Sequence, residues 1–123
     1  MTDEYAQLDV ATGNLEAFVI CLALGTLREM RDGNVPYEVG IWTLGRPIFS
    51  RNSEIEKLLS PETLRVLQAA DEVDALAKLA GTDKANEWLD EMIDTLQRGL
   101  KSLPDPCWYA RWAGMKIEQE DAH

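Results

Sequence analysis

The chain has 123 residues, of which 46% are hydrophobic and 28% are charged. This length supports one domain with a buried core, and the apolar fraction is too high for a disordered chain. The 22 acidic residues outnumber the 12 basic ones and give a net charge of -10. A surface this negative repels nucleic acid and anionic membranes, so we expect neither as a direct partner.

Targeting signals and metal-binding motifs are not evident. The first ten residues, MTDEYAQLDV, contain acids and no basic residue, unlike a secretory signal peptide. The longest apolar run, residues 17–24, is too short to cross a membrane. Cys21 and Cys107 form no CxxC pair, and the single histidine, His123, is the last residue. We therefore expect a cytoplasmic protein with a buried thiol at Cys21, no metal, no cofactor and no imidazole-based catalysis.

The first part of the chain predicts one strong helix. Residues 1–12 are expected to form a frayed short helix. Apolar residues then recur at helical spacing over residues 14–32, with Asn14 as the N-cap and Gly33 at the end.

A shorter helix is expected next. It begins near Pro36 and ends at Gly45. Residues 46–50 are expected to be an extended connector, because the residue before a proline avoids helical backbone angles. Asn52 or Ser53 then caps a short helix that ends near Leu59.

Two longer helices follow. Ser60 is an N-cap residue followed by proline, so a helix is predicted over residues 61–80, ending at Gly81. Thr82 is expected to cap the next helix, over residues 83–102. Five or six helices with short connections predict an all-α fold, as a single-domain bundle or an orthogonal array.

The end of the chain is ambiguous. Trp108 and Trp112 are spaced for a helix, but the intervening residues also suit a strand. We favour a short helix here, and residues 118–123 are expected to be frayed. The aromatic residues here, Trp108, Tyr109 and Trp112, either close the core or act as anchors of an interface. Trp42 and Trp88 are expected in the core.

The helix predicted over residues 83–102 has an acidic side and an apolar side. At 100° per residue, four acids fall within about 60° of one another, namely Asp83, Glu87, Asp90 and Asp94. Glu91 adds a like-charge pair with Glu87, and each such pair costs the helix about 0.2–0.5 kcal/mol. The apolar residues lie opposite: Trp88, Leu89, Met92, Ile93, Leu96 and Leu100.

Much of the negative charge is concentrated around this helix. Residues 71–94, which include Asp71 and Asp74, hold eight acids and two lysines, a net charge of -6. One interpretation is an ordinary solvated face. The other is a docking surface that steers a basic partner, and a nuclease is the best-motivated partner because its cleft must be basic to hold RNA or DNA.

One enzymatic alternative remains open. Asp71/Asp74 and Glu87/Asp90 form two acidic i,i+3 pairs on consecutive predicted helices. The arrangement is similar to the ExxE…ExxD pattern of all-α nucleotide pyrophosphohydrolases of the MazG type, which implies magnesium-dependent triphosphate hydrolysis. The first pair departs from that pattern by having two aspartates, and the second pair faces away from the apolar side of its helix.

A second resemblance covers most of the chain. Residues 37–49 (YEVGIWTLGRPIF) and 58–64 (LLSPETL), followed by the acidic helices, resemble the immunity proteins of bacterial toxin systems, including contact-dependent growth inhibition. The resemblance implies an inhibitor, not an enzyme, that binds its cognate toxin in the cytoplasm and covers the active cleft. A small regulatory adaptor that presents residues 108–112 to a larger enzyme is a further alternative.

Overall fold

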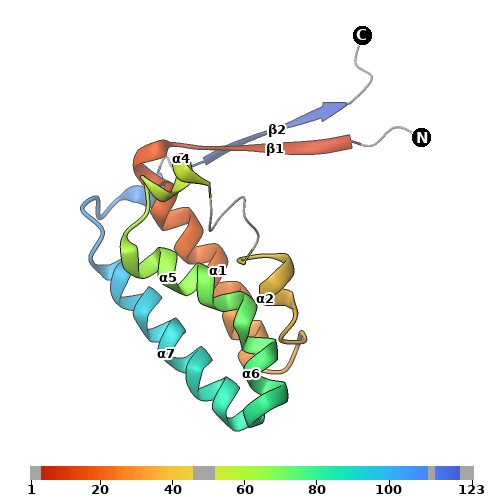
Figure 1. Ribbon diagram of the computed structural model, residues 1–123. Helices are drawn as coiled ribbons and strands as arrows, with labels where there is room; N and C mark the ends of the chain where they lie inside the picture. Colours follow the sequence, from red (N-terminus) through yellow and green to blue (C-terminus); the bar gives the residue numbers. More distant parts are fainter. Residues whose placement is uncertain (1–3, 46–51, 111–112, 120–123) are drawn as a thin grey trace.

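The computed structural model describes residues 4–45, 52–110 and 113–119 (Figure 1). The fold is a small all-α domain, as predicted, with one short strand added at each end. The elements are β1 (Glu4–Val10), η1 (Thr12–Asn14), α1 (Leu15–Arg31), α2 (Val39–Trp42), α4 (Ser53–Glu56), α5 (Pro61–Ala69), η2 (Ala70–Glu72), α6 (Val73–Ala80), α7 (Thr82–Lys101), η3 (Trp108–Ala110) and β2 (Ala113–Gln119), where η marks a short 3-10 helix.

The two longest helices, α1 and α7, form the centre of the fold. They pack along each other, and α5 and α6 pack against α7 on another side (Figure 1). The residues between them are apolar and almost completely buried, among them Ile20, Leu27, Leu67, Leu89 and Leu96. Each such side chain stabilises the fold by about 1.5–3 kcal/mol when it is buried instead of exposed. The packing of these helices is therefore the main source of stability.

The predicted helix starts are largely confirmed. The Ser60 hydroxyl accepts a hydrogen bond from the Thr63 N–H at 3.3 Å, directly before Pro61. The Asn52 side chain accepts hydrogen bonds from the N–H groups of Glu54 and Ile55. α7 instead begins at Thr82 itself, after Gly81 with φ of 95°, and has no side-chain cap.

The helix predicted over residues 61–80 is interrupted. A 3-10 turn, η2, separates α5 from α6. Ala70 in this turn is fully buried, and its carbonyl oxygen lies so close to Gly40 of α2 that a Cβ on Gly40 would be 2.3 Å from it. The turn therefore lies where the backbones of two segments meet, a contact that helical periodicity cannot reveal.

The terminal segments correct the prediction of frayed ends within residues 4–12 and 118–119, whereas residues 1–3 and 120–123 lie outside the described residues. Residues 4–10 form a strand and not a helix, and they pair antiparallel with residues 113–119, with Leu8 opposite Met115. Of residues 107–117, where a short helix is favoured over a strand, residues 108–110 form η3 and residues 113–117 belong to β2. Figure 1 shows this two-stranded ribbon extending away from the helices. The strand pairing requires residues more than a hundred positions apart, so no local pattern specifies it.

Two other predictions about single residues need correction. Trp42 is 65% exposed on α2 and does not lie in the core, whereas Trp88 is half-buried against the core as expected. Cys21 is a free thiol that is only half-buried, and this burial raises its pKa. The connector predicted over residues 46–50 lies outside the described residues.

The close approach at Gly40 predicts the effect of substitution. Gly40→Ala should destabilise the fold by about 1–3 kcal/mol, because the new methyl group meets the Ala70 backbone and not a flexible side chain. Gly25→Ala is the matched control: it lies inside α1 with no atom within 4 Å of the added Cβ. It should stabilise by about 0.5–1 kcal/mol. Urea unfolding of both variants checks this, and equal effects would contradict the packing at η2.

Candidate protein-binding face

The predicted acidic side of α7 faces solvent. Asp83, Glu87, Asp90, Glu91 and Asp94 are all exposed, while the opposite side of the helix is buried in the core. We call these five residues the acidic face. The structure thus confirms the division of α7 into an apolar side and a charged side.

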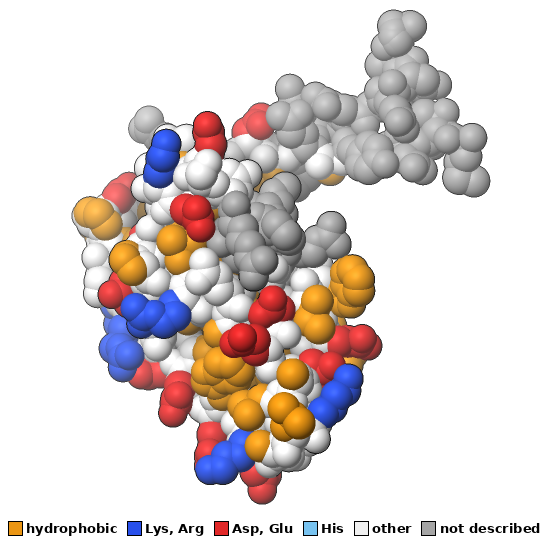
Figure 2. Space-filling view, viewed as in Figure 1, with side chains coloured by type: hydrophobic (Ala, Val, Ile, Leu, Met, Phe, Trp, Pro, Cys, Tyr) orange, Lys and Arg blue, Asp and Glu red, His pale blue; other side chains and the backbone are white. Residues whose placement is uncertain are grey.

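Cations of the same chain contact three residues of the acidic face. Glu87 forms an ion pair with Lys84 at 3.4 Å, and Asp94 forms one with Arg98 on the next turn. The third, Asp90, is bound by Arg31 of α1. Asp83 and Glu91 form no ion pair within the described part of the chain. These ion pairs make the face less uniformly negative than the sequence suggested. Figure 2 likewise shows acidic and basic side chains interspersed over the visible side of the molecule.

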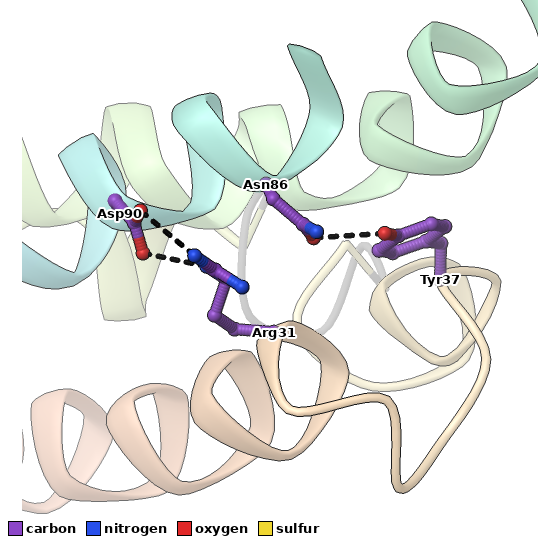
Figure 3. Close-up of polar contacts among 4 residues, drawn as sticks. All are labelled: Arg31, Tyr37, Asn86 and Asp90. Atoms are coloured by element: carbon purple, nitrogen blue, oxygen red, sulfur yellow. Dashed lines mark hydrogen bonds and ion pairs between the residues drawn. The ribbon is translucent and has the colours of Figure 1, made fainter. Parts of the chain in front are cut away.

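Asp90 differs from the other four because it connects two helices (Figure 3). The Arg31 Nε donates to Asp90 Oδ1 at 2.8 Å, and Arg31 Nη2 lies 3.4 Å from Asp90 Oδ2. This hydrogen bond and the carboxylate charge raise the pKa of Arg31. Asp90 is thus a structural contact between α1 and α7, and it is not a simple surface charge.

A second polar contact lies close to this pair. The Tyr37 hydroxyl, from the segment before α2, donates to Asn86 Oδ1 of α7 at 2.8 Å (Figure 3). Together the two contacts attach the end of α1 and the start of α2 to one edge of α7. They connect the N-terminal half of the acidic face to α1 and to the segment before α2.

Asp71 and Asp74 lie apart from α7 in the chain and have local environments of their own. Both are half-buried. Asp71, in η2, packs against Gly45, where an added Cβ would lie 2.7 Å from the Asp71 Cβ. Asp74 forms an ion pair with Lys78 at 2.8 Å within α6, and this contact raises the pKa of Lys78.

The carboxylates do not converge into a metal site. In the parts of the chain that the structure covers, no group of three or more Asp, Glu, His or Cys side chains is placed to hold a metal ion. Asp90 points towards Arg31 of α1, and Asp74 is paired along its own helix. Within the described residues, no three of the four acids in the pyrophosphohydrolase-like pattern are therefore gathered as candidate ligands of one metal ion.

The aromatic residues near the end of the chain are only partly available. Trp108 is half-buried in η3, and its carbonyl oxygen accepts a long hydrogen bond of 3.5 Å from Asn14 Nδ2. Its ring meets Tyr109 edge to face, with the centroids 5.8 Å apart. Tyr109 is 63% exposed and is the more accessible of the two. Trp112 lies outside the described residues.

The structure also contains a pocket that the sequence analysis did not identify. It lies at the start of α5, has a volume of about 440 Å³, and is lined by residues that include Glu16, Ser60, Thr63 and Arg98. Glu16 Oε2 accepts hydrogen bonds from the Ser60 N–H at 3.0 Å and from the buried Thr63 hydroxyl at 2.7 Å. This carboxylate therefore stabilises the N-terminus of α5, a role consistent with helix-dipole attraction.

No helix in the described ranges has the length and apolar character needed to cross a membrane. The chain also matches no protein-family model, no curated protein sequence and no solved structure. What the molecule does must therefore be argued from its own side chains, and the acidic face is the largest charged feature that the structure positions on one helix.

The contact between Tyr37 and Asn86 predicts a measurable loss. Tyr37→Phe should lower the free energy of unfolding by about 1 kcal/mol, because a half-buried amide oxygen loses its donor. Tyr109→Phe serves as the control, since Tyr109 is exposed and its hydroxyl has no hydrogen-bond partner among the described residues. Chemical denaturation of both variants gives the comparison, and equal losses would argue against a stabilising Tyr37 hydrogen bond.

Proposed function

We propose that this chain is an immunity protein that binds a cognate toxin in the cytoplasm and covers its active cleft. The observation that carries the proposal is the acidic face: five exposed carboxylates on one side of a helix whose other side is anchored in the core. Nothing in this arrangement requires a reaction at the face. A rigid array of charges is instead suited to recognising a surface of opposite charge.

The spacing of the carboxylates favours a nuclease as the toxin. The acidic face extends over residues 83–94, a length of about 16 Å along the helix axis, which is the rise of about five stacked nucleotides. A nuclease cleft must present Lys or Arg to bind phosphates. The carboxylates of α7 can occupy the same positions in place of phosphates, and this competition would block the cleft.

The ion pairs within the acidic face do not oppose this proposal. Pairs between exposed side chains contribute only about 0–1 kcal/mol, because water screens them and the side chains lose freedom. Lys84 and Arg98 can therefore move aside when a partner supplies better-placed cations. The net charge of -10 adds a long-range attraction that speeds association with a basic protein.

The contacts of the acidic face determine which of its residues are suitable for charge reversal in a binding experiment. Charge reversal at Asp90 would also break the contact with Arg31, so a binding defect there would be ambiguous. Glu87 and Glu91 are better, since both are exposed and neither connects two helices within the described residues. Glu54→Lys with Glu62→Lys gives the same change in net charge at exposed positions outside α7.

We expect Glu87→Lys with Glu91→Lys to slow association with the basic toxin domain by about tenfold or more at low salt, and by less at about 150 mM salt. The toxin domain is sought by sequencing the DNA immediately upstream of this gene for a reading frame that ends in a basic C-terminal domain, and stopped-flow fluorescence measures the rate. The control pair should slow association much less. Equal slowing by both pairs would show that net charge matters but the acidic face does not, and unchanged rates in both would contradict electrostatic docking.

A further inference from the structure

A groove borders the acidic face on the side of α5. It has a volume of about 740 Å³ and is lined by residues of α5, η2, α6 and α7. Trp88 of α7 is one of them, and its side chain is half-buried against the core. At 100° per residue, Trp88 and Glu91 are about 60° apart around α7, so the groove and the acidic face are neighbours.

Three charged side chains line this groove together with Trp88, namely Arg65 of α5 and Asp71 and Glu72 of η2. Asp71 is half-buried, with its side chain against Gly45, and the other two are exposed. None of the three forms an ion pair within the described residues. The carboxylates of the groove therefore lack a cation partner in the part of the chain that the structure describes.

The combination of an indole ring and carboxylates favours one kind of cation. In the described ranges, no cation stacks on Trp88. A guanidinium is planar and weakly hydrated, so it can stack on an indole ring and donate two hydrogen bonds to a carboxylate at the same time. A lysine ammonium is a compact and strongly hydrated charge, and it gains less from such a surface. The groove therefore suits arginine better than lysine.

Arg65 taken alone would favour an anion in the groove. The two carboxylates outnumber it, however, and the eight acids of residues 71–94 extend the negative charge along α7. The net charge of -10 acts in the same direction at longer range. We therefore expect Arg65 to weaken the binding of a cation without reversing the preference of the groove.

We propose that this groove binds an arginine side chain of a basic partner protein, with the guanidinium stacked on Trp88 and donating to the carboxylates of Asp71 and Glu72. The identity of the partner as a toxin rests on the function proposed above, whereas the preference for a guanidinium rests on the groove alone. An arginine packed on a tryptophan is an energetic anchor of the kind that slows dissociation. The exposed charges of the acidic face instead speed association.

The experiment is an NMR titration of the isotope-labelled full chain with acetyl-arginine-amide. The control probes are acetyl-citrulline-amide, which has a similar shape and no charge, and acetyl-lysine-amide. The indole N–H signal of Trp88, identified by its loss in Trp88→Phe, should shift with an affinity for the arginine probe at least about fivefold above that for either control. The Trp42 indole, 65% exposed on α2, reports non-specific stacking and should shift little with all three.

Charge variants then locate the guanidinium. Asp71→Asn with Glu72→Gln should weaken binding of the arginine probe about fivefold or more, because both carboxylate partners are lost. Asp32→Asn with Glu54→Gln removes the same charge at exposed positions outside the groove and should weaken binding much less. Arg65→Gln should tighten binding about twofold, because it removes the like charge from the groove.

Three results would overturn the proposal. No shift of the Trp88 indole, or equal affinity for a control probe, would show that the groove does not recognise a guanidinium. Equal weakening by both neutralised pairs would assign the effect to net charge. Weaker binding in Arg65→Gln would make Arg65 a contact of the probe, which a guanidinium cannot be. Because the probes contain no toxin and the acidic face is tested by association rates, failure of one proposal is distinguishable from failure of the other.

Discussion

The contact between α1 and α7 is the constraint on which the rest of the structure depends. Both helices bury one apolar side, and the side chains between them, such as Leu27 and Leu96, are inaccessible to water. Because the apolar side of α7 faces the core, the carboxylates on its opposite side face solvent. The same packing that stabilises the fold therefore also determines where the charged surface lies, and the position of the charges follows from the hydrophobic effect.

Polar contacts at the rim of this core select one arrangement of the packed helices. Arg31 with Asp90, and Tyr37 with Asn86, fix α1 and the segment after it against α7. Glu16 connects α1 to the start of α5 in the same way. Such contacts contribute little net stability individually, but they are directional and apolar packing is not. Asp90 illustrates the consequence: an acid on the solvent side of a helix can be a structural residue.

Most of the helical fold could be predicted from local patterns. Periodicity identified α1 and α7, and the cap residues Asn52 and Ser60 located two helix starts, because these signals are contained within a few adjacent residues. The exposure of the acidic face was predictable for the same reason. The partner of Asp90 could not be predicted in this way, because Arg31 reaches Asp90 only when α1 and α7 have packed together. The break at η2 and the exposure of Trp42 likewise depend on which segments meet in space.

The two strands were not predicted, although the sequence of β1 has a pattern typical of a strand. Apolar residues at positions 6, 8 and 10 alternate with polar ones, as in a half-buried strand. This pattern covers only a few residues, and neither strand is followed by a hairpin turn to its partner, because the partner is at the other end of the chain.

This pairing of the two ends has a consequence for how the molecule forms during synthesis. β1 leaves the ribosome before the helices of this fold, and β2 leaves it after them. The helices can collapse on each other while β1 still has no strand beside it, and closing so long a loop carries an entropic penalty that grows only slowly with length. We therefore expect the ribbon to join last, onto a helical body that is already folded, so that β1 stays without its partner strand until β2 has been synthesised.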